Sequence, residues 1–450
     1  MKRIIDYYLK NWKTDRYRKP LLLRGARQVG KTHAARRLGA TFPDFFEINL
    51  EDQSAAQIIF EKDLQPERII RELSALMLKP IIPGQTLLFI DEIQAVPRAL
   101  LALRYFYEKM PELHVIAAGS LLDFAIEQVG IPVGRVDSLY VHPLSFMEFL
   151  CALNAQILVE EILSHTSTSI DAISTVVHNK LLGLVGEYLA IGGMPEVVNC
   201  WQEIKDPLAC PKFHKSILAA YRQDFGKYAK RLQVKYVEVL FEHIPLQLGQ
   251  QFRYSAIEGE FRKRELAPAL DLLVTAGIAQ KVYSSAGHGI PLGAQIDPLD
   301  YKVIFLDVAL AQIMLGLQTS GWYIHPLAEF VNKGALVEAF IGQEILVYSD
   351  PSSRPNLYYW HRKERSSNAE IDYLLQQEEF AIPIEVKSGE GRTLRSLQMF
   401  LDSHQKSPYG IRFSTQNYSE YNKIRSYPLY AAFQLGMWQN ELRKSIESLL

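Results

Sequence analysis

The chain has 450 residues, 48% of them hydrophobic and 22% charged, and its formal net charge is −1. This balance is typical of a globular protein, and the length exceeds what one hydrophobic core usually holds, so two or three domains are expected. The near-zero net charge excludes an overall basic field for nucleic acid, although a local basic patch fits within a neutral total. The three cysteines lack metal-ligand spacing and indicate structural thiols in a reducing compartment.

The N-terminus and the hydrophobic segments bear on localisation. The first residues lack the continuous apolar core and small-residue cleavage site of a secretion signal. No later segment is apolar for the length of a bilayer. We therefore expect a cytoplasmic protein without a membrane partner.

A phosphate-binding loop is predicted at residues 25–32, Gly-Ala-Arg-Gln-Val-Gly-Lys-Thr, between an apolar run and a helix-like stretch. Gly25 and Gly30 let the backbone curl tightly and aim N–H groups at phosphate oxygens. Lys31 supplies a positive charge for the β- and γ-phosphates, and the Thr32 hydroxyl can hold Mg²⁺. The loop residues between the glycines are also expected to border the nucleotide, although Arg27 can equally face solvent or a partner: Arg27, Gln28 and Val29.

A second nucleotide-site element is predicted where the apolar run 86–90 ends in Asp91 and Glu92. In enzymes with a phosphate-binding loop, the aspartate at this strand end orders the Mg²⁺, and a following glutamate can polarise the attacking water. We assign these roles to Asp91 and Glu92 respectively. The alternative is a chance glycine-rich turn followed by an acidic strand end. The two motifs together predict an ATP site that requires Mg²⁺.

A parallel α/β sheet is predicted for the ATPase core, residues 1–145. Ser120 follows the fourth predicted strand beside the strand of Asp91, where its hydroxyl could sense the γ-phosphate; the alternative is a helix N-cap. Helix-like segments separate the strands. The predicted strands are residues 21–24, 45–50, 87–90, 114–118 and 138–142.

Two further regions follow the predicted core. Residues 146–230 show helical patterns and predict a helical lid. Residues 231–330 show short helices followed, at residues 265–283, by a helix, a glycine and a strand, an order that resembles a winged helix. The basic cluster at residues 262–264 precedes the presumed third helix, where it could contact DNA phosphates or lie as a solvated helix end.

The last predicted domain, residues 331–450, carries a second candidate site. Asp372 and Glu385 lie on strand-like segments, and alternation places Glu385 and Lys387 on the same face. The two carboxylates could share a divalent metal while Lys387 positions water or stabilises phosphate charge, which suits hydrolysis of a phosphodiester. The alternative is an exposed Glu-x-Lys charge pair.

These C-terminal residues resemble the PD-(D/E)xK nuclease core, with Asp372 as the first acidic residue and Glu385-Val-Lys387 as the (D/E)xK element. Glu338, in an apolar helix-like segment, matches the helical glutamate that many members of that fold place beside the metal. The resemblance therefore adds Glu338 to Asp372 and Glu385 as an expected metal ligand.

The whole chain resembles the AAA-type ATPases with a C-terminal DUF4143 region. The resemblance rests on the phosphate loop, Asp91-Glu92-Ile-Gln, Gly-Arg followed by Pro-Leu-Ser-Phe, Gly-Gly-Met-Pro-Glu, and the two acidic strands. It implies an AAA+ type module, a winged-helix segment and a nuclease-like domain. Arg135, before the fifth predicted strand, is the candidate γ-phosphate sensor or arginine finger, with a surface salt bridge as the alternative.

Three functions follow from these predictions. The leading one is an ATPase whose nucleotide cycle controls the winged-helix and nuclease-like half, with DNA as the partner. The second is an ATP-dependent switch whose inactive C-terminal domain binds a protein. The third, a small-molecule kinase, is disfavoured because Glu92 directly follows Asp91. A homo-oligomer stays open, because no coiled-coil repeat or other assembly signal is visible.

Overall fold

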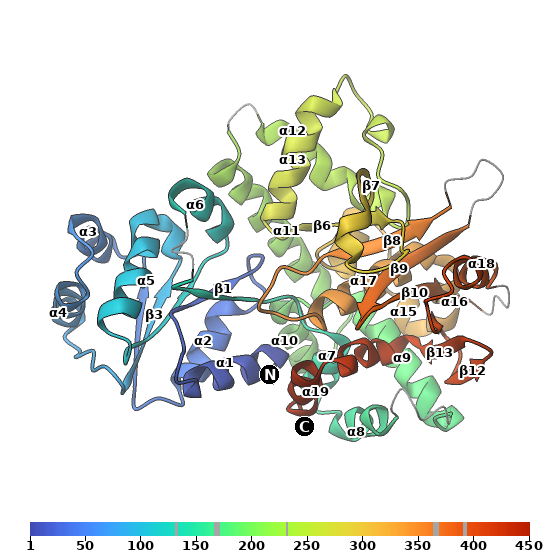
Figure 1. The fold of residues 1–450 in the computed structure, drawn as a ribbon, viewed down its shortest axis with the longest axis horizontal. Coiled ribbons are helices and arrows are strands. Elements are labelled where there is room, and N and C mark those ends of the chain that lie inside the picture. Colours follow the sequence, from blue (N-terminus) through green and yellow to red (C-terminus); the bar gives the residue numbers. More distant parts are fainter. Residues whose placement is uncertain (131–133, 166–171, 231–232, 363–368, 390–393) are drawn as a thin grey trace. The chain divides into compact units, whose positions relative to one another are not determined.

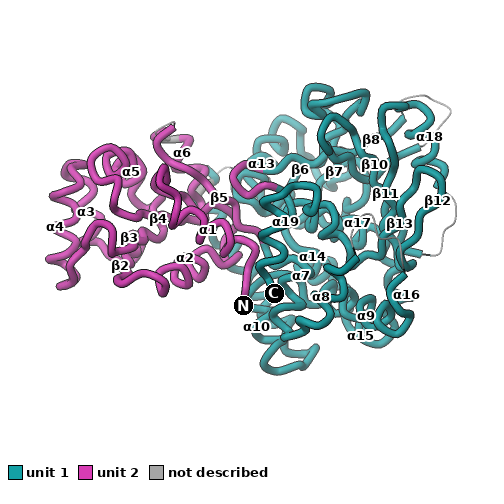
Figure 2. Tube along the Cα trace, turned by 60° about the horizontal axis from the view of Figure 1, so that its bottom comes forward, with its two compact units in different colours: residues 1, 143–349, 355–450 teal, residues 2–142, 350–354 magenta. Residues whose placement is uncertain are grey.

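The computed structural model describes residues 1–130, 134–165, 172–230, 233–362, 369–389 and 394–450 (Figure 1). The chain divides into two compact units, coloured separately in Figure 2. The small unit comprises residues 2–142 and 350–354, and the large unit comprises residues 1, 143–349 and 355–450. The predicted ATPase core thus corresponds closely to the small unit, and the other three predicted domains lie together in the large unit.

A parallel sheet of five strands, in the order β2-β3-β4-β1-β5, forms the centre of the small unit within its described residues. Every strand pair in it is parallel, which confirms the predicted parallel α/β core. The strands are apolar along most of their length because helices cover parallel sheets on both faces. They are β1 (Leu21–Arg24), β2 (Asp44–Asn49), β3 (Thr86–Asp91), β4 (His114–Ala118) and β5 (Asp137–Tyr140).

The helices of the small unit pack their apolar sides against this sheet. Leu88 and Ile90 of β3 are fully buried in a core that includes Phe60 and Leu103 from the covering helices. This core fixes the carboxyl ends of the strands, where the loops of the nucleotide site begin. The helices are α1 (Ile4–Thr14), α2 (Lys31–Gly39), α3 (Ser54–Lys62), α4 (Pro66–Met77), α5 (Pro97–Lys109) and α6 (Leu122–Val129).

The large unit begins with a helical region that matches the predicted lid in sequence position. Its first helix has a complete capping box, because Glu148 N–H donates to Ser145 Oγ and Ser145 N–H donates to the Glu148 carboxylate. The helices are α7 (Phe146–Ala152), α8 (Gln156–Ser164), α9 (Thr175–Ile191), α10 (Pro195–Ile204) and α11 (Cys210–Tyr228).

The Gly192-Gly193 pair has a packing role in the large unit. Leu144 N–H donates to Gly193 O over 2.7 Å, and Gly193 N–H donates to Asp307 Oδ2 over 2.7 Å. A Cβ on Gly193 would overlap the Leu144 carbonyl, and Gly192 has φ of +77°, so both positions require glycine. These motif residues therefore join the segments before α7, after α9 and before α14 (Val308–Met314).

An eight-stranded mixed sheet crosses most of the large unit, in the order β12-β13-β11-β10-β9-β8-β6-β7. Two of its strands come from the predicted winged-helix region, since Val282 of β6 pairs in parallel with Leu357 of β8. The regions predicted as 231–330 and 331–450 thus share one sheet. Its strands are β6 (Ala279–Ser285), β7 (Ile296–Phe305), β8 (Leu357–His361), β9 (Glu370–Gln377), β10 (Phe380–Lys387), β11 (Gly410–Ser414), β12 (Ser419–Tyr421) and β13 (Ile424–Pro428).

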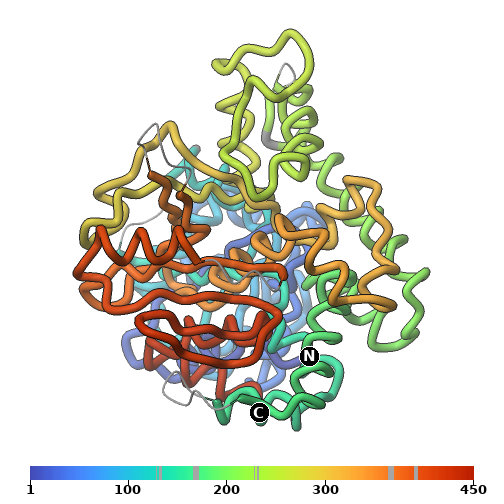
Figure 3. The backbone as a smooth tube through the Cα atoms, turned by 90° about the vertical axis from the view of Figure 1, so that its right-hand side faces the viewer, coloured from blue at the N-terminus to red at the C-terminus, as the bar shows by residue number. Residues whose placement is uncertain are grey.

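The remaining helices of the large unit pack against this sheet or against other helices. Helix α17 packs against β7 and β10, two strands that lie far apart in the sheet order. The yellow-green segment with α12 and the start of α13 projects at the top of Figure 3, away from the red C-terminal strands. In the described parts of the chain, no helix has the length and apolar character needed to cross a membrane. These helices are α12 (Val234–His243), α13 (Lys263–Thr275), α15 (Gly321–Ile324), α16 (Pro326–Asn332), α17 (Gly334–Val347), α18 (Arg395–Ser403) and α19 (Asn440–Glu447).

Candidate functional site

The loop between β1 and α2 has the backbone shape that a phosphate cradle needs. Gly25 and Gly30 have φ of +127° and +100°, and Gln28 also has a positive φ of +64°. A Cβ on Gly25 would overlap the carbonyl oxygen of Val141, so the first turn of the loop requires glycine. The loop ends where α2 begins at Lys31, which places the N–H groups of a helix N-terminus at the cradle.

Lys31 folds back over this loop. Its Nζ donates to the carbonyl oxygens of Gly25 over 2.9 Å and Ala26 over 2.7 Å. Burial lowers the pKa of Lys31 to about 8, against the opposing effect of the nearby Glu92 and Asp91 carboxylates. Its present partners are neutral carbonyls, so phosphate oxygens would be stronger partners for the same ammonium.

Thr32 and Asp91 meet at the base of the loop. The Thr32 hydroxyl donates to Asp91 Oδ2 over 2.8 Å, and Asp91 is 7% exposed. Burial raises the pKa of Asp91, and the Thr32 hydrogen bond opposes that rise. A hydroxyl and a carboxylate oxygen converging beside a phosphate cradle fit Mg²⁺, which prefers oxygen ligands and few protein donors.

Glu92 lies just beyond the end of β3 in a left-handed conformation, with φ of +49°. Non-glycine residues in this region are uncommon and concentrate at functional sites. The Gln94 side-chain amide donates to Glu92 Oε2, and a Cβ on Gly119 would overlap Gln94 Oε1. Gln94 therefore sets the position of the Glu92 carboxylate. This role of Gln94 was not expected from the sequence.

Four other predicted residues occupy different surroundings. Ser120 follows β4, which lies between β1 and β3, and α6 begins at Leu122 without a side-chain cap, so the N-cap alternative for Ser120 is wrong. Arg135 Nε donates to Glu108 Oε1 over 3.1 Å at the surface, the salt bridge weighed as its alternative role. Val29 is buried within the loop and Arg27 is half-buried.

The structure also brings the predicted C-terminal acidic residues together. Asp372 of β9 accepts a hydrogen bond from Val386 N–H of β10 over 2.7 Å. Glu385 and Lys387 form an ion pair on β10, with Glu385 5% and Lys387 35% exposed. Burial raises the pKa of Glu385, and the Asp372 charge adds to that rise. Glu338 reaches the same cluster from α17, as the resemblance implied.

A lysine that the sequence analysis missed lies among these carboxylates. Lys302 of β7 places Nζ 2.9 Å from Glu338 Oε1 and 3.8 Å from Asp372 Oδ1, and it forms an ion pair with Glu370. Its side chain is 3% exposed. Burial opposes its charge, but the carboxylates, Glu338 first, raise the pKa of Lys302 above its ordinary value.

Three family models match the chain. A model described as an AAA domain matches residues 17–150, which include the phosphate loop and both nucleotide-site acids. A domain of unknown function, DUF8612, matches residues 183–321, and another, DUF4143, matches residues 333–431. The chain is an AAA-type protein with a C-terminal DUF4143 domain. The AAA domain is of the nucleotide-binding ATPase type, as predicted, and the DUF8612 match spans the boundary predicted near residue 230.

Solved structures that match include the Walker-type ATPase PABY2304 of Pyrococcus abyssi, with 16% identity and a TM-score of 0.45 over 69% of this chain and 95% of that chain. PCH-2 of C. elegans matches with 13% identity and a TM-score of 0.27 over 45% and 62% of the two chains. The ORC1 protein of Aeropyrum pernix, in complex with DNA, matches with 13% identity and a TM-score of 0.24 over 69% and 90%. No curated protein sequence matches.

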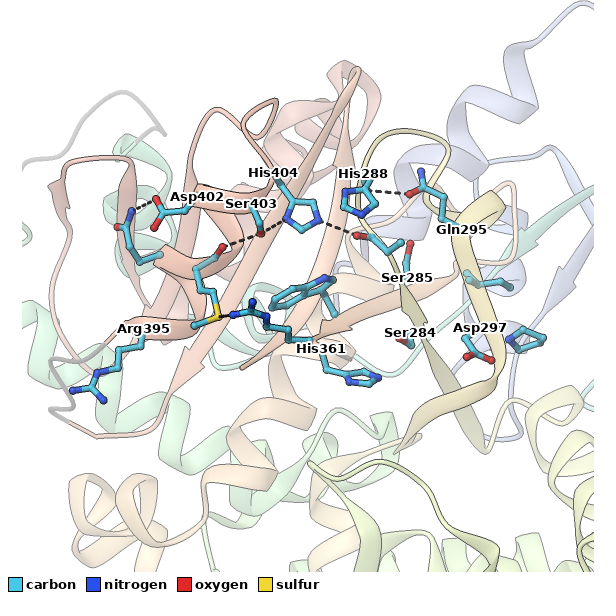
Figure 4. A pocket seen from close by; sticks show the side chains of 17 residues that line it. Ser284, Ser285, His288, Gln295, Asp297, His361, Arg395, Asp402, Ser403 and His404 are labelled. Atoms are coloured by element: carbon cyan, nitrogen blue, oxygen red, sulfur yellow. Dashed lines mark hydrogen bonds between the residues drawn. The ribbon is translucent and has the colours of Figure 1, made fainter. Parts of the chain in front are cut away.

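A cavity of about 1120 Å³ lies near the DUF4143 strands, lined by residues of β6, β8 and α18 (Figure 4). His404 stacks on Phe400 with ring centroids 3.9 Å apart and on His288 at 4.7 Å. Ser403 Oγ lies 2.8 Å from His404 Nδ1, but Nε2 of the same ring lies 2.9 Å from the Ala286 carbonyl oxygen. In a serine-histidine-acid triad a carboxylate holds the second ring nitrogen, but here a backbone carbonyl does so. The Ser403–His404 contact is therefore a packing contact and not a catalytic pair.

Proposed function

We propose that the AAA domain binds ATP with Mg²⁺ and hydrolyses it to ADP and phosphate. The observation that carries this proposal is the 2.8 Å hydrogen bond between Thr32 Oγ1 and Asp91 Oδ2. It joins the phosphate loop to the end of β3, directly before Glu92. Only an arrangement with loop, hydroxyl and carboxylate together offers both a phosphate cradle and a magnesium position.

Each residue of the site has a separate task in this proposal. Lys31 leaves the loop carbonyls for the β- and γ-phosphates, while the loop N–H groups bind phosphate oxygens. Thr32 and Asp91 hold the Mg²⁺, which neutralises phosphate charge when bound. Glu92 accepts a proton from the attacking water, and Ser120 lies at the strand end where it can contact the γ-phosphate.

We further propose that the nucleotide state controls the large unit. The support is the segment 350–354, which belongs to the small unit although the chain on both sides of it belongs to the large one. Pro351 O accepts a hydrogen bond from Tyr140 N–H of β5 over 2.8 Å. This segment connects α17 to β8, so a shift of β5 would be passed along the chain to elements of the large unit.

DNA is a second proposal for what the large unit acts on. The observation that favours it is the basic cluster Arg262, Lys263 and Arg264, whose side chains are all exposed where α13 begins. Exposed cations at a helix N-terminus can contact phosphates without reading base sequence. The alternative partner is a protein, for which the same exposed surface would not need its positive charge. Self-assembly into a homo-oligomer is compatible with both proposals.

The test is phosphate release from ATP and Mg²⁺ by the full chain, with and without double-stranded, single-stranded and branched DNA. Glu92→Gln should retain ATP binding and lose turnover, and normal turnover by this variant would refute the base assignment. For DNA, the double variant Lys263→Ala, Arg264→Ala should lose any DNA binding or stimulation. The matched control is Lys406→Ala, Lys423→Ala, which removes the same charge from exposed positions elsewhere on the large unit.

A further inference from the structure

The acidic cluster of the large unit already contains a cation. Lys302 Nζ lies 2.9 Å from Glu338 Oε1 and 3.8 Å from Asp372 Oδ1, with the Glu370 carboxylate as a further ion-pair partner. The three carboxylates come from α17 and β9, while the lysine comes from β7. An ammonium therefore already lies between two of the carboxylates that would hold a metal in this cluster.

Lys302 is held in this position from several sides. Its backbone pairs with Val282 of β6 and forms a bridge with Gln251 on the other side. Its Nζ lies 5.2 Å from the ring centroid of Tyr359, a cation–π distance. With 3% of the side chain exposed, the ammonium is almost fully enclosed by the protein.

The second lysine of the cluster is also paired with a carboxylate. Lys387 forms its ion pair with Glu385 Oε1, and Asp372 Oδ2 accepts the Val386 N–H. Two ammonium groups thus accompany the four carboxylates Glu338, Glu370, Asp372 and Glu385. Mg²⁺ demands a near-octahedral set of oxygen ligands. At the carboxylates of Glu338 and Asp372 it would meet the buried positive charge of Lys302 at short range, and this repulsion opposes metal binding.

We infer that Lys302 is a built-in counter-ion that takes the place of a divalent metal, so that the cluster stabilises the joint between β7, β9 and α17 and does not cleave DNA. Within the described ranges, no group of three or more acidic, histidine or cysteine side chains is placed to hold a metal ion. The predicted ligands Glu338, Asp372 and Glu385 do not fit a metal while Lys302 lies among them. This inference goes beyond the proposed ATPase activity and stands or falls independently of it.

One carboxylate oxygen of the cluster could still bind a metal. Glu385 Oε2 is buried and has no hydrogen-bond partner among the described residues. Glu385 would offer this oxygen to a metal that entered the cluster despite Lys302. The decisive experiment is therefore direct metal binding, with Glu385→Gln and Asp372→Asn as the variants that would remove such a site.

The experiment titrates Mn²⁺ into the nucleotide-free full chain and follows free Mn²⁺ by electron paramagnetic resonance. Every protein carries Asp91→Asn, which removes the metal position of the AAA domain from the signal. We expect no stoichiometric binding tighter than about 1 mM. Stoichiometric binding that Asp372→Asn or Glu385→Gln abolishes would overturn the inference, whatever the behaviour of any Lys302 variant.

The converse experiment removes the lysine. Lys302→Met keeps an unbranched side chain but removes the terminal ammonium, which leaves three carboxylates without their counter-ion. Mn²⁺ should then bind at least about tenfold more tightly than to the lysine-containing protein and raise the midpoint of thermal unfolding. Lys281→Met is the matched control, because Lys281 lies on the neighbouring β6 and pairs with Asp271, which is 63% exposed. A folded Lys302→Met protein that gains no Mn²⁺ binding would contradict the substitution of lysine for metal.

Discussion

The AAA domain and the eight-stranded sheet of the large unit each place a buried lysine near carboxylates, but the two lysines have opposite partners. Lys31 donates to the neutral carbonyl oxygens of Gly25 and Ala26. Lys302 is paired with the carboxylates of Glu338 and Glu370. A buried ammonium with only carbonyl partners gains by exchanging them for phosphate, whereas one that is already ion-paired has nothing to gain from a ligand.

This contrast separates two sites that look alike in sequence. Both contain an acidic residue at the end of an apolar strand and a lysine within reach. In the AAA domain the hydroxyl of Thr32 and the carboxylate of Asp91 meet beside the loop and are the oxygen ligands that a small cation would use. In the large unit, Lys302 of β7 is a cation from the chain itself that fills this role. The comparison teaches that the partners of a lysine, rather than its presence, distinguish a ligand site from a structural one.

The largest expected effect concerns Glu92. Replacing it by glutamine removes the proton acceptor but keeps the side-chain shape, so turnover should fall about 10²- to 10⁴-fold while ATP still binds. Single-turnover phosphate release, together with a nucleotide-binding titration, measures both quantities. Glu67→Gln, an exposed change on α4, is the control. Equal turnover by the Glu92→Gln and Glu67→Gln variants would contradict the assignment of Glu92 as the proton acceptor.

The next effect concerns stability. Lys302→Met leaves buried carboxylates without a counter-ion and should lower the free energy of unfolding of the large unit by about 3 to 5 kcal/mol. Lys281→Met breaks a pair whose carboxylate is largely exposed and should cost at most about 1 kcal/mol. Urea unfolding followed by tryptophan fluorescence compares the two. Similar losses of unfolding free energy for both variants would show that Lys302 does not stabilise the large unit more than an ordinary partly exposed ion pair does.

A smaller effect concerns pH. In the unliganded fold, burial lowers the pKa of Lys31 from 10.5 to about 8. Below about pH 8 the buried charge therefore reduces the free energy of unfolding, and this reduction disappears as the pH rises toward 10.5. Phosphate binding needs the charged form. The dissociation constant for ATP should therefore rise above pH 8, by up to about tenfold per pH unit.

Lys31→Arg is the control for this pH dependence, because a guanidinium stays charged across the range. Its affinity for ATP, whatever its value near neutral pH, should not change between about pH 7 and about pH 9. Displacement of a fluorescent nucleotide gives both profiles. Parallel profiles for lysine and arginine would show that the titrating group lies elsewhere.

The smallest expected effect concerns Arg135. Its salt bridge with Glu108 is exposed, so Arg135→Ala should change the unfolding free energy by less than about 1 kcal/mol. If Arg135 is instead the arginine finger, turnover should fall by about 10³-fold or more. Glu108→Ala breaks the same salt bridge and keeps the arginine, so a loss of turnover in Arg135→Ala alone would identify the finger.

Local patterns predicted the small unit well. The predicted strands 21–24 and 114–118 have the observed bounds of β1 and β4, because short apolar runs between glycine and polar residues carry a strong strand signal. The phosphate loop and the Asp91-Glu92 strand end were predictable for the same reason. Each is a continuous segment whose chemistry depends on neighbours in the chain.

Long-range pairing was beyond local patterns. Val282 pairs with Leu357, and periodicity within either strand says nothing about this partner. The role of Lys302 was not predictable from local patterns, because it lies in the region predicted as a winged helix and its partners lie on α17 and β9. One signal was present, since residues 300–305 read Asp-Tyr-Lys-Val-Ile-Phe and form a buried stretch of β7. A lysine on such a strand needs a charged partner.

The most direct test of the contrast between the two domains is a single reaction containing the full chain, ATP, Mg²⁺, Mn²⁺ and double-stranded, single-stranded or branched DNA. Phosphate release and DNA length are measured in the same sample. The account predicts phosphate release that Glu92→Gln abolishes and DNA that stays intact with either metal. Metal-dependent cleavage that is lost in Lys387→Ala, with phosphate release unchanged, would contradict it.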